Sequence, residues 1–328
     1  MYEQQFRAFA PRRRIEILDA VFRLYRERFA IFAGIVTLVI LPPQGALFLL
    51  QDNEDWSAMV VIIGMTASFT LLPALLIHIT SECILGNAIP PIKTVLTVLR
   101  RIFVLVMALG LTVFPISAFF ASLFASLMNY VGDAGALCLC PALPFLGYAS
   151  LLLQIFIGPV FILEKPGIWR GIKRSLALAR LGFIAVAGLM TLLYFILMAL
   201  GGAFSVLLII AISLIGPTSS SPLIDALGIM AIEVLMIFLI PILPITLTLA
   251  YYDARIRLEG LDLTLNLYDQ PVSLSALPSP DLALTQGGIW IDIKNIGYLV
   301  LMYAILYGLP MLVSVGINAL FVPGSGGF

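Results

Sequence analysis

The sequence predicts an all-α fold, a polytopic transmembrane helix bundle of about seven spans with short amphipathic helices at the membrane interface. The first observation is composition: 61% of the 328 residues are hydrophobic, 11% are charged and the mean hydropathy is +1.10, whereas soluble domains are about 45–50% apolar. The second is that several uncharged runs exceed the roughly 18–20 residues that a helix needs to cross the hydrocarbon core. The third is a basic amphipathic stretch that recurs before three of the spans.

The long apolar runs predict seven spans, at 29–50, 57–86, 102–128, 136–163, 183–215, 223–250 and 296–322. The fifth would extend about 50 Å at 1.5 Å per residue, beyond a hydrocarbon core of about 30 Å. It could be two spans, but that would place Arg255 and Arg257 outside, against the positive-inside rule. We therefore favour one long tilted helix, for which Gly201–Gly202 is the candidate break.

The basic residues all lie on one side of this arrangement. The loops that follow the odd-numbered spans contain no Lys or Arg, so the 18 basic residues fall on the opposite side. The positive-inside rule makes that side the cytoplasm. We expect the N-terminus inside, the C-terminus outside, and Cys138 and Cys140 at the outer surface.

Three basic amphipathic stretches, which we call elbows, precede the outgoing spans at Arg12–Arg28, Pro91–Arg101 and Gly167–Arg180. In the third, an apolar face opposes a cationic one: Ile168, Ile172 and Leu176 against Arg170, Lys173 and Arg174. Such helices lie in the interface with their cations at the lipid phosphates. The chain thus divides into a membrane domain of three elbow-plus-hairpin units (1–262), a proline-containing cytoplasmic linker (263–293) and an additional span (294–328).

Three stretches carry a family resemblance: "ILDAVFRLYRERF", "GPVFILEKPGIWRGIKRSLALARLGF" and "LAYYDARIRLEG". Over about residues 14–262 the chain resembles the membrane-domain family named after glycerophosphoryl diester phosphodiesterases, six-span proteins that are mostly uncharacterised. The resemblance implies the bacterial cytoplasmic (inner) membrane, and the family's motif residues correspond here to Glu164, Arg174, Ser175, Tyr252, Asp253, Arg255, Arg257 and Glu259. It does not extend to the catalytic domain that gives the family its name, because a phosphodiesterase of that type needs histidines around a metal and the sequence has one histidine, His78.

The closing motif allows two interpretations. Asp253 and Arg257, like Arg255 and Glu259, are spaced four apart and can pair on a helix. The tyrosines before them suit an interfacial aromatic belt, and Gly260 suits a helix C-cap. A helix that only faced lipid phosphates could omit the acids, so we expect arginines to pair with them and to lock span six against an elbow. Arg174 is the leading cross-elbow partner for Asp253; a ligand site is the alternative.

Three polar residues fall within apolar runs. His78 and Glu82 share a helical face and could bind a proton or a metal, although two ligands are an incomplete set and Glu82 could instead pair with an elbow arginine. Glu233 lies near the midplane when counted from the outer loop, which would make it a buried relay. Counted from Tyr251, it lies about 27 Å away, near the outer surface, and we favour this interpretation.

These features favour a non-enzymatic integral membrane scaffold or accessory protein that engages anionic lipid head groups and partner proteins at the cytoplasmic face. We expect no cofactor, no metal and no nucleic acid. The alternative is a small transporter or lipid-handling protein, which would need a polar cavity shared by His78, Glu82 and Glu233. A lipid-modifying enzyme would need clustered acids, bases or metal ligands, and the sequence offers too few.

Overall fold

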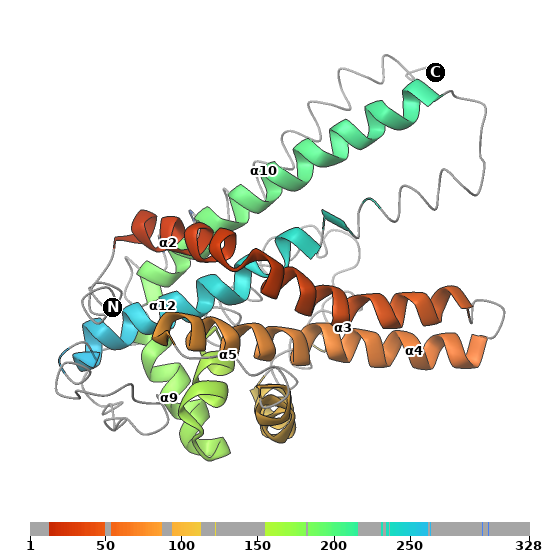
Figure 1. Ribbon diagram of the computed structural model, residues 1–328. Helices are drawn as coiled ribbons and strands as arrows, with labels where there is room; N and C mark the ends of the chain where they lie inside the picture. The colour runs from red at the N-terminus through yellow and green to blue at the C-terminus, as the bar shows by residue number, and fades with distance from the viewer. Residues whose placement is uncertain are drawn as a thin grey trace.

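The computed structural model describes residues 13–49, 54–86, 94–112, 155–181, 183–215 and 237–261, together with a few single residues (Figure 1). Within these residues every regular element is helical, which confirms the predicted all-α fold. Five of the helices are long and apolar enough to cross a membrane. Residues 136–154 of the fourth predicted span, which include Cys138 and Cys140, lie outside the described residues, as do Glu233 and nearly all of the linker and final span.

The first elbow and first span form as predicted. Helix α2 (Arg14–Glu27) begins with the Glu16 carboxylate accepting a 2.9 Å hydrogen bond from the Arg13 backbone N–H, which satisfies one of the free donors at the helix start. A turn at Arg28 leads into α3 (Phe29–Leu49). The chain therefore leaves the elbow at the predicted residue.

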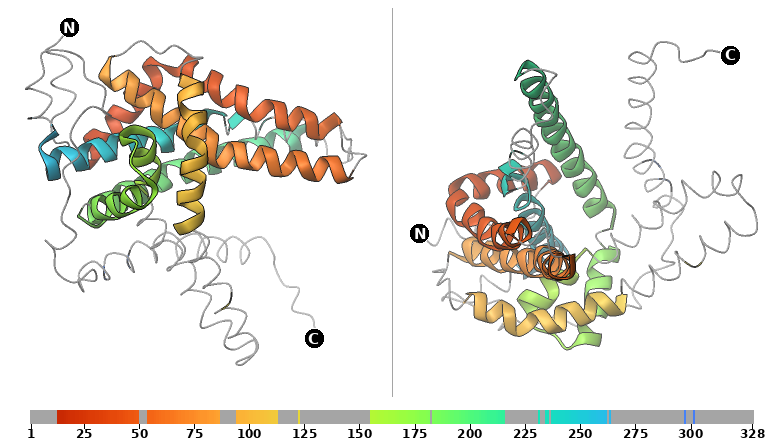
Figure 2. Two further views of the ribbon diagram at one scale, coloured as in Figure 1. Left: turned by 90° about the horizontal axis from the view of Figure 1, so that it is seen from below. Right: turned by 90° about the vertical axis from the view of Figure 1, so that its right-hand side faces the viewer.

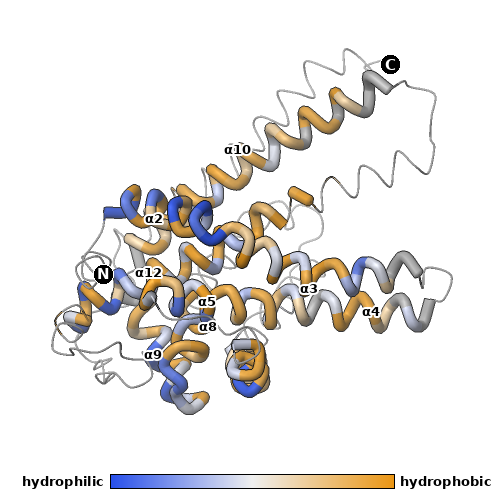
Figure 3. The backbone as a smooth tube through the Cα atoms, viewed as in Figure 1, coloured by the Kyte–Doolittle hydropathy of each residue, from blue (hydrophilic) through white to orange (hydrophobic). Residues whose placement is uncertain are grey.

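The second span is a helix with a π-helical insertion. It consists of α4 (Glu54–Thr66), η1 (Ala67–Leu71) and α5 (Leu72–Leu85), and α4 runs back along α3 as an antiparallel hairpin (Figure 1). Apolar side chains are exposed along both arms, among them Leu38, Ile62 and Phe69. Figure 3 shows these arms as largely hydrophobic, as expected of surfaces that face lipid.

The second elbow differs from the prediction. The helix Thr94–Thr112 runs through Arg100 and Arg101 without a break, so this elbow is the first part of the span helix and not a separate one. No proline or other helix-stop lies between Thr94 and Leu109 to force a turn. Arg101 instead donates a 3.3 Å hydrogen bond from Nη1 to the Phe161 carbonyl oxygen. Figure 2 shows this helix crossing beside the α3–α4 hairpin.

The third elbow and the fifth span are both present. Helix α9 (Ile168–Leu181) is followed by α10 (Phe183–Ile215), which is one continuous helix of 33 residues through Gly201–Gly202. This agrees with the single-helix interpretation. Gly171 on α9 is buried, and a Cβ at this position would lie 2.4 Å from Cζ of Phe161. The absence of a side chain lets α9 pack directly on the residues before it.

Helix α12 (Ile242–Glu259) is the central element and packs against α2, α5 and α9. It ends at Gly260, whose left-handed φ of 64° forms the predicted C-cap. Most of the core is aliphatic and aromatic, but Arg255 and Tyr251 are among its largest fully buried side chains. A charged side chain in an apolar core requires partners, and these partners form the candidate site.

Candidate functional site

The first residue of the site, Glu164, is positioned by an irregular helix end. The chain passes from a single turn, α8 (Ile157–Pro159), into the π-helix η2 (Val160–Glu164) and then stops at Lys165, which has a φ of 60°. Lys165 is the one non-glycine residue with positive φ in the described part of the chain. Such backbone costs about 1–3 kcal/mol and is found at positions that the surroundings strongly determine. Here it ends the helix directly after the Glu164 carboxylate.

Three further residues of the site come from one face of α12. Tyr251, Arg255 and Glu259 are spaced four apart, so they are stacked along the helix. Arg255 donates from Nε to Glu259 Oε2 over 2.8 Å and from Nη1 to the Tyr251 hydroxyl over 3.3 Å. This face is directed at η2 and α9, because both elements contact α12 through these side chains.

Arg174 on α9 completes the set. Its Nη2 lies 2.8 Å from Oε1 and 3.0 Å from Oε2 of Glu259, and its Nε donates to Glu164. Arg255 Nη1 lies 3.5 Å from Glu164 Oε1, and the Tyr251 hydroxyl donates to the same carboxylate. Each of the two carboxylates therefore contacts both guanidinium groups. We call Glu164, Arg174, Glu259 and Arg255 the charge ring.

The charge ring is buried and electrically balanced. The side chains of Arg255, Glu259 and Glu164 are 1%, 2% and 4% exposed, and that of Arg174 is 10% exposed. Two positive and two negative groups sum to zero, and each contact around the ring joins opposite charges. Burial by itself lowers the pKa of Arg174, but its hydrogen bond to Glu164 and the charges of Glu164 and Glu259 outweigh burial and raise that pKa. The ring is thus a closed network of ion pairs.

The structure corrects two sequence expectations about these residues. Asp253 does not pair with Arg174: its Oδ2 accepts a 2.7 Å bond from Nε of Arg257 on the same helix. Arg174 reaches α12 through Glu259 instead, because Glu259 lies on the face directed at α9. Arg174 is also 10% exposed and held in the charge ring, whereas Arg170 and Lys173 of the same elbow are exposed.

The motif tyrosines are core residues and not members of an interfacial belt. Tyr251 is fully buried and Tyr252 is 3% exposed. The Tyr252 hydroxyl lies 2.8 Å from the Ser81 hydroxyl on α5, in a buried hydrogen bond that joins α12 to α5. Sequence reasoning missed Ser81, which has no local signal. It also missed the role of Tyr251, which the i, i+4, i+8 spacing with Arg255 and Glu259 could have indicated.

The other candidate residues lie apart from the charge ring. Ser175 is 1% exposed, and its hydroxyl has no hydrogen-bond partner among the described residues. His78 Nδ1 is 3.7 Å from Glu82 Oε1 on α5. Across the described ranges, no group of three or more His, Cys, Asp or Glu side chains is placed to hold a metal ion.

Chemically, the charge ring joins three segments far apart in the sequence: η2, α9 and the end of α12. Its carboxylates are engaged by guanidinium and phenol donors, as expected of a buried network that fixes geometry. A scan against protein-family models found no matching family, and searches of curated proteins and of solved structures found no match. The assignment of a role therefore depends on the geometry of the chain itself.

Proposed function

We propose that this protein is a non-enzymatic integral membrane scaffold or accessory protein that engages anionic lipid head groups and partner proteins at the end of the bundle formed by α2, α9 and the last turns of α12. The observation that carries the proposal is that the buried charges and the exposed cations lie in separate places. The buried charges cancel within the ring, whereas Arg170 and Lys173 of α9 remain exposed. The exposed cations are available to an external anion.

The outer face of α9 has the chemistry of an interfacial helix. Trp169 is 67% exposed, and Lys173 Nζ lies 5.6 Å from the centre of its ring, while Arg170 is also exposed. Tryptophan is enriched at membrane interfaces, and each Lys or Arg near an anionic surface contributes about 1 kcal/mol. One turn further along α9, Arg174 fixes the helix to the bundle through Glu164 and Glu259. The charge ring would therefore hold a basic, aromatic surface in one orientation.

The test measures which lipids the protein retains. Full-length protein would be purified from membranes of mixed composition with wild-type residues and with Arg170→Gln plus Lys173→Gln, and bound lipids would be quantified by mass spectrometry. We expect the glutamine variant to lose enrichment of anionic over zwitterionic lipid. A charge-conserving variant, Arg170→Lys plus Lys173→Arg, should keep it. Equal enrichment in all three proteins would reject the proposal.

A lipid-handling or transport role is the second candidate, and one observation favours it. His78 lies within the candidate span Ala58–Leu85, and its buried Nδ1 has no hydrogen-bond partner among the described residues. Glu82 is one turn away. A transporter would use these groups in a polar pathway together with Glu233. Lipid or solute flux in proteoliposomes that is abolished by His78→Ala, with lipid retention unchanged, would favour this role over the scaffold.

A further inference from the structure

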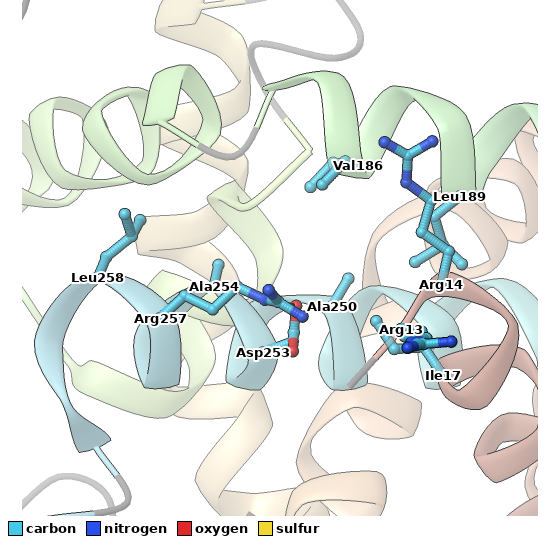
Figure 4. Close-up of a pocket in the computed structure, with 11 residues that line it drawn as sticks. Arg13, Arg14, Ile17, Val186, Leu189, Ala250, Asp253, Ala254, Arg257 and Leu258 are labelled. Atoms are coloured by element: carbon cyan, nitrogen blue, oxygen red, sulfur yellow. The ribbon is translucent and has the colours of Figure 1, made fainter. Parts of the chain in front are cut away.

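A cavity of about 440 Å³ lies beside α12 and is lined by none of the charge-ring residues. Figure 4 shows the side chains that line it. Its volume falls within the roughly 300–1,000 Å³ typical of ligand sites. The start of α2, the start of α10 and the last turns of α12 each contribute to its wall. Four of its lining residues are charged: Arg13, Arg14, Asp253 and Arg257. We call it the arginine pocket.

The charges of the arginine pocket favour an anion. Three arginines and one aspartate give a formal charge of +2, in contrast to the neutral ring on the other face. Arg257 is already paired with Asp253, whereas Arg13 and Arg14 have no side-chain ion pair with any described residue. The Arg14 guanidinium lies directly over α10, since a Cβ at Gly188 would be 2.6 Å from its Nη1. Figure 4 shows Arg14 beside Leu189, with the Arg257 and Asp253 side chains together across the pocket.

The remainder of the wall is apolar, and it leads toward the bilayer. Val186, Leu189, Ala250 and Ala254 line the pocket. Val186 and Leu189 belong to the candidate span Ala185–Leu208, which begins at the pocket. An anion seated among the arginines would thus lie where this span enters the polar region, and an attached hydrocarbon chain could follow α10. A free inorganic anion would gain nothing from the apolar wall.

We propose that the arginine pocket is a binding site for one anionic phospholipid, whose phosphate is held by Arg13, Arg14 and Arg257 and whose glycerol and first acyl carbons contact the apolar wall. Asp253 orients the Arg257 guanidinium through its 2.7 Å pair. A phosphate monoester carries a charge of about −1.5 to −2, close to the +2 of the pocket. The inference refines the proposed lipid engagement, on which it rests, to a defined site with a stoichiometry of one.

Native mass spectrometry of the full-length protein, titrated with dioleoyl phosphatidic acid and separately with dioleoyl phosphatidylcholine, tests the site. We expect one saturable phosphatidic acid adduct and no equivalent phosphatidylcholine adduct. Arg13→Gln plus Arg14→Gln should weaken the adduct by roughly 30-fold, since two cations each contribute about a factor of five to six near an anionic lipid. The matched control, Arg23→Gln plus Arg26→Gln, makes the same charge change on the same helix, at exposed residues outside the pocket. It should stay within about threefold of the wild type.

A second variant separates the pocket from surface charge. Ala185 is exposed and lines the pocket, so Ala185→Phe would fill part of it and leave every charge in place. We expect this variant to lose the saturable adduct while its thermal stability stays within a few degrees of the wild type. Retention of the adduct in Ala185→Phe, or equal weakening by the Arg23 and Arg26 control, would overturn the inference.

Two further comparisons show whether the bound group is a lipid or free phosphate, and they test the pocket separately from the proposed function. Inorganic phosphate should fail to displace the lipid at concentrations at which short-chain phosphatidic acid succeeds; equal competition would show a phosphate site and overturn the lipid assignment. If the Arg170 and Lys173 variant loses anionic lipid while the pocket variants keep the saturable adduct, the pocket inference fails and the proposed function stands. If no variant loses anionic lipid, both fail.

Discussion

Replacing Arg174 with glutamine should destabilise the folded protein by about 3–5 kcal/mol, because it leaves two buried carboxylates with only Arg255 between them, so that one negative charge is uncompensated. Glu164 and Glu259 are 4% and 2% exposed, so neither can regain the lost interaction from water. The internal reference is Arg257→Gln. Arg257 is 49% exposed and its pair with Asp253 is a surface pair, which predicts a loss of no more than about 1 kcal/mol.

The unfolding equilibrium in mixed detergent micelles measures both losses. A double-mutant cycle of Arg174→Gln with Glu259→Gln isolates the cross-helix interaction. In the double variant the remaining Glu164 and Arg255 are still balanced, so we expect it to be more stable than the sum of the single losses predicts, by about 0.5–3 kcal/mol. The pH should be held near neutrality and kept the same for every variant.

Two outcomes would refute this reasoning. If Arg174→Gln is no more destabilising than Arg257→Gln, the ring is too hydrated to carry the desolvation penalty assigned to it. If the two single losses are additive, Arg174 and Glu259 do not couple α9 to α12, and the docking of the elbow must come from apolar packing.

Two further predictions concern the contacts around the ring. Gly171→Ala should destabilise the protein by about 1–3 kcal/mol, because its Cβ would overlap the buried Phe161 ring; the second substitution Phe161→Leu should restore part of the loss, and an unfolding midpoint equal to the wild type would contradict the close packing of α9. Tyr252→Phe should cost about 1 kcal/mol through loss of the 2.8 Å bond to Ser81, and adding Ser81→Ala should change stability little further, so a full second loss would show that the two hydroxyls act separately.

The sequence predicts the elements of this fold better than their contacts. Apolar length and basic flanks are properties of single segments, which is why α3, α9 and α10 match their predicted ranges. The break predicted at Arg101 failed because a pair of arginines does not stop a helix; a turn residue or a proline does. At Arg28 the turn that the structure shows separates α2 from α3.

The charge ring was only partly predictable. The spacing within α12 indicates that Arg255 and Glu259 pair, and the same rule pairs Asp253 with Arg257. Which of these pairs faces α9 depends on the rotation of α12, which is set by long-range packing. A difference of two positions turns a side chain by about 200° around the helix. Asp253 therefore pairs with an arginine, as expected, but it lies on a different face of α12 from the one that contacts Arg174.

That rotation gives α12 two faces of different electrical character. Tyr251, Arg255 and Glu259 lie against η2 and α9, where buried charges cancel and the contact is closed. Asp253 and Arg257 lie against α2 and α10, where the lining charges sum to +2 around a cavity. Because Asp253 and Arg257 cancel each other, the excess of +2 comes from Arg13 and Arg14. The alternation of residues in this short motif thus separates the group that holds the helices together from the group available to a lipid.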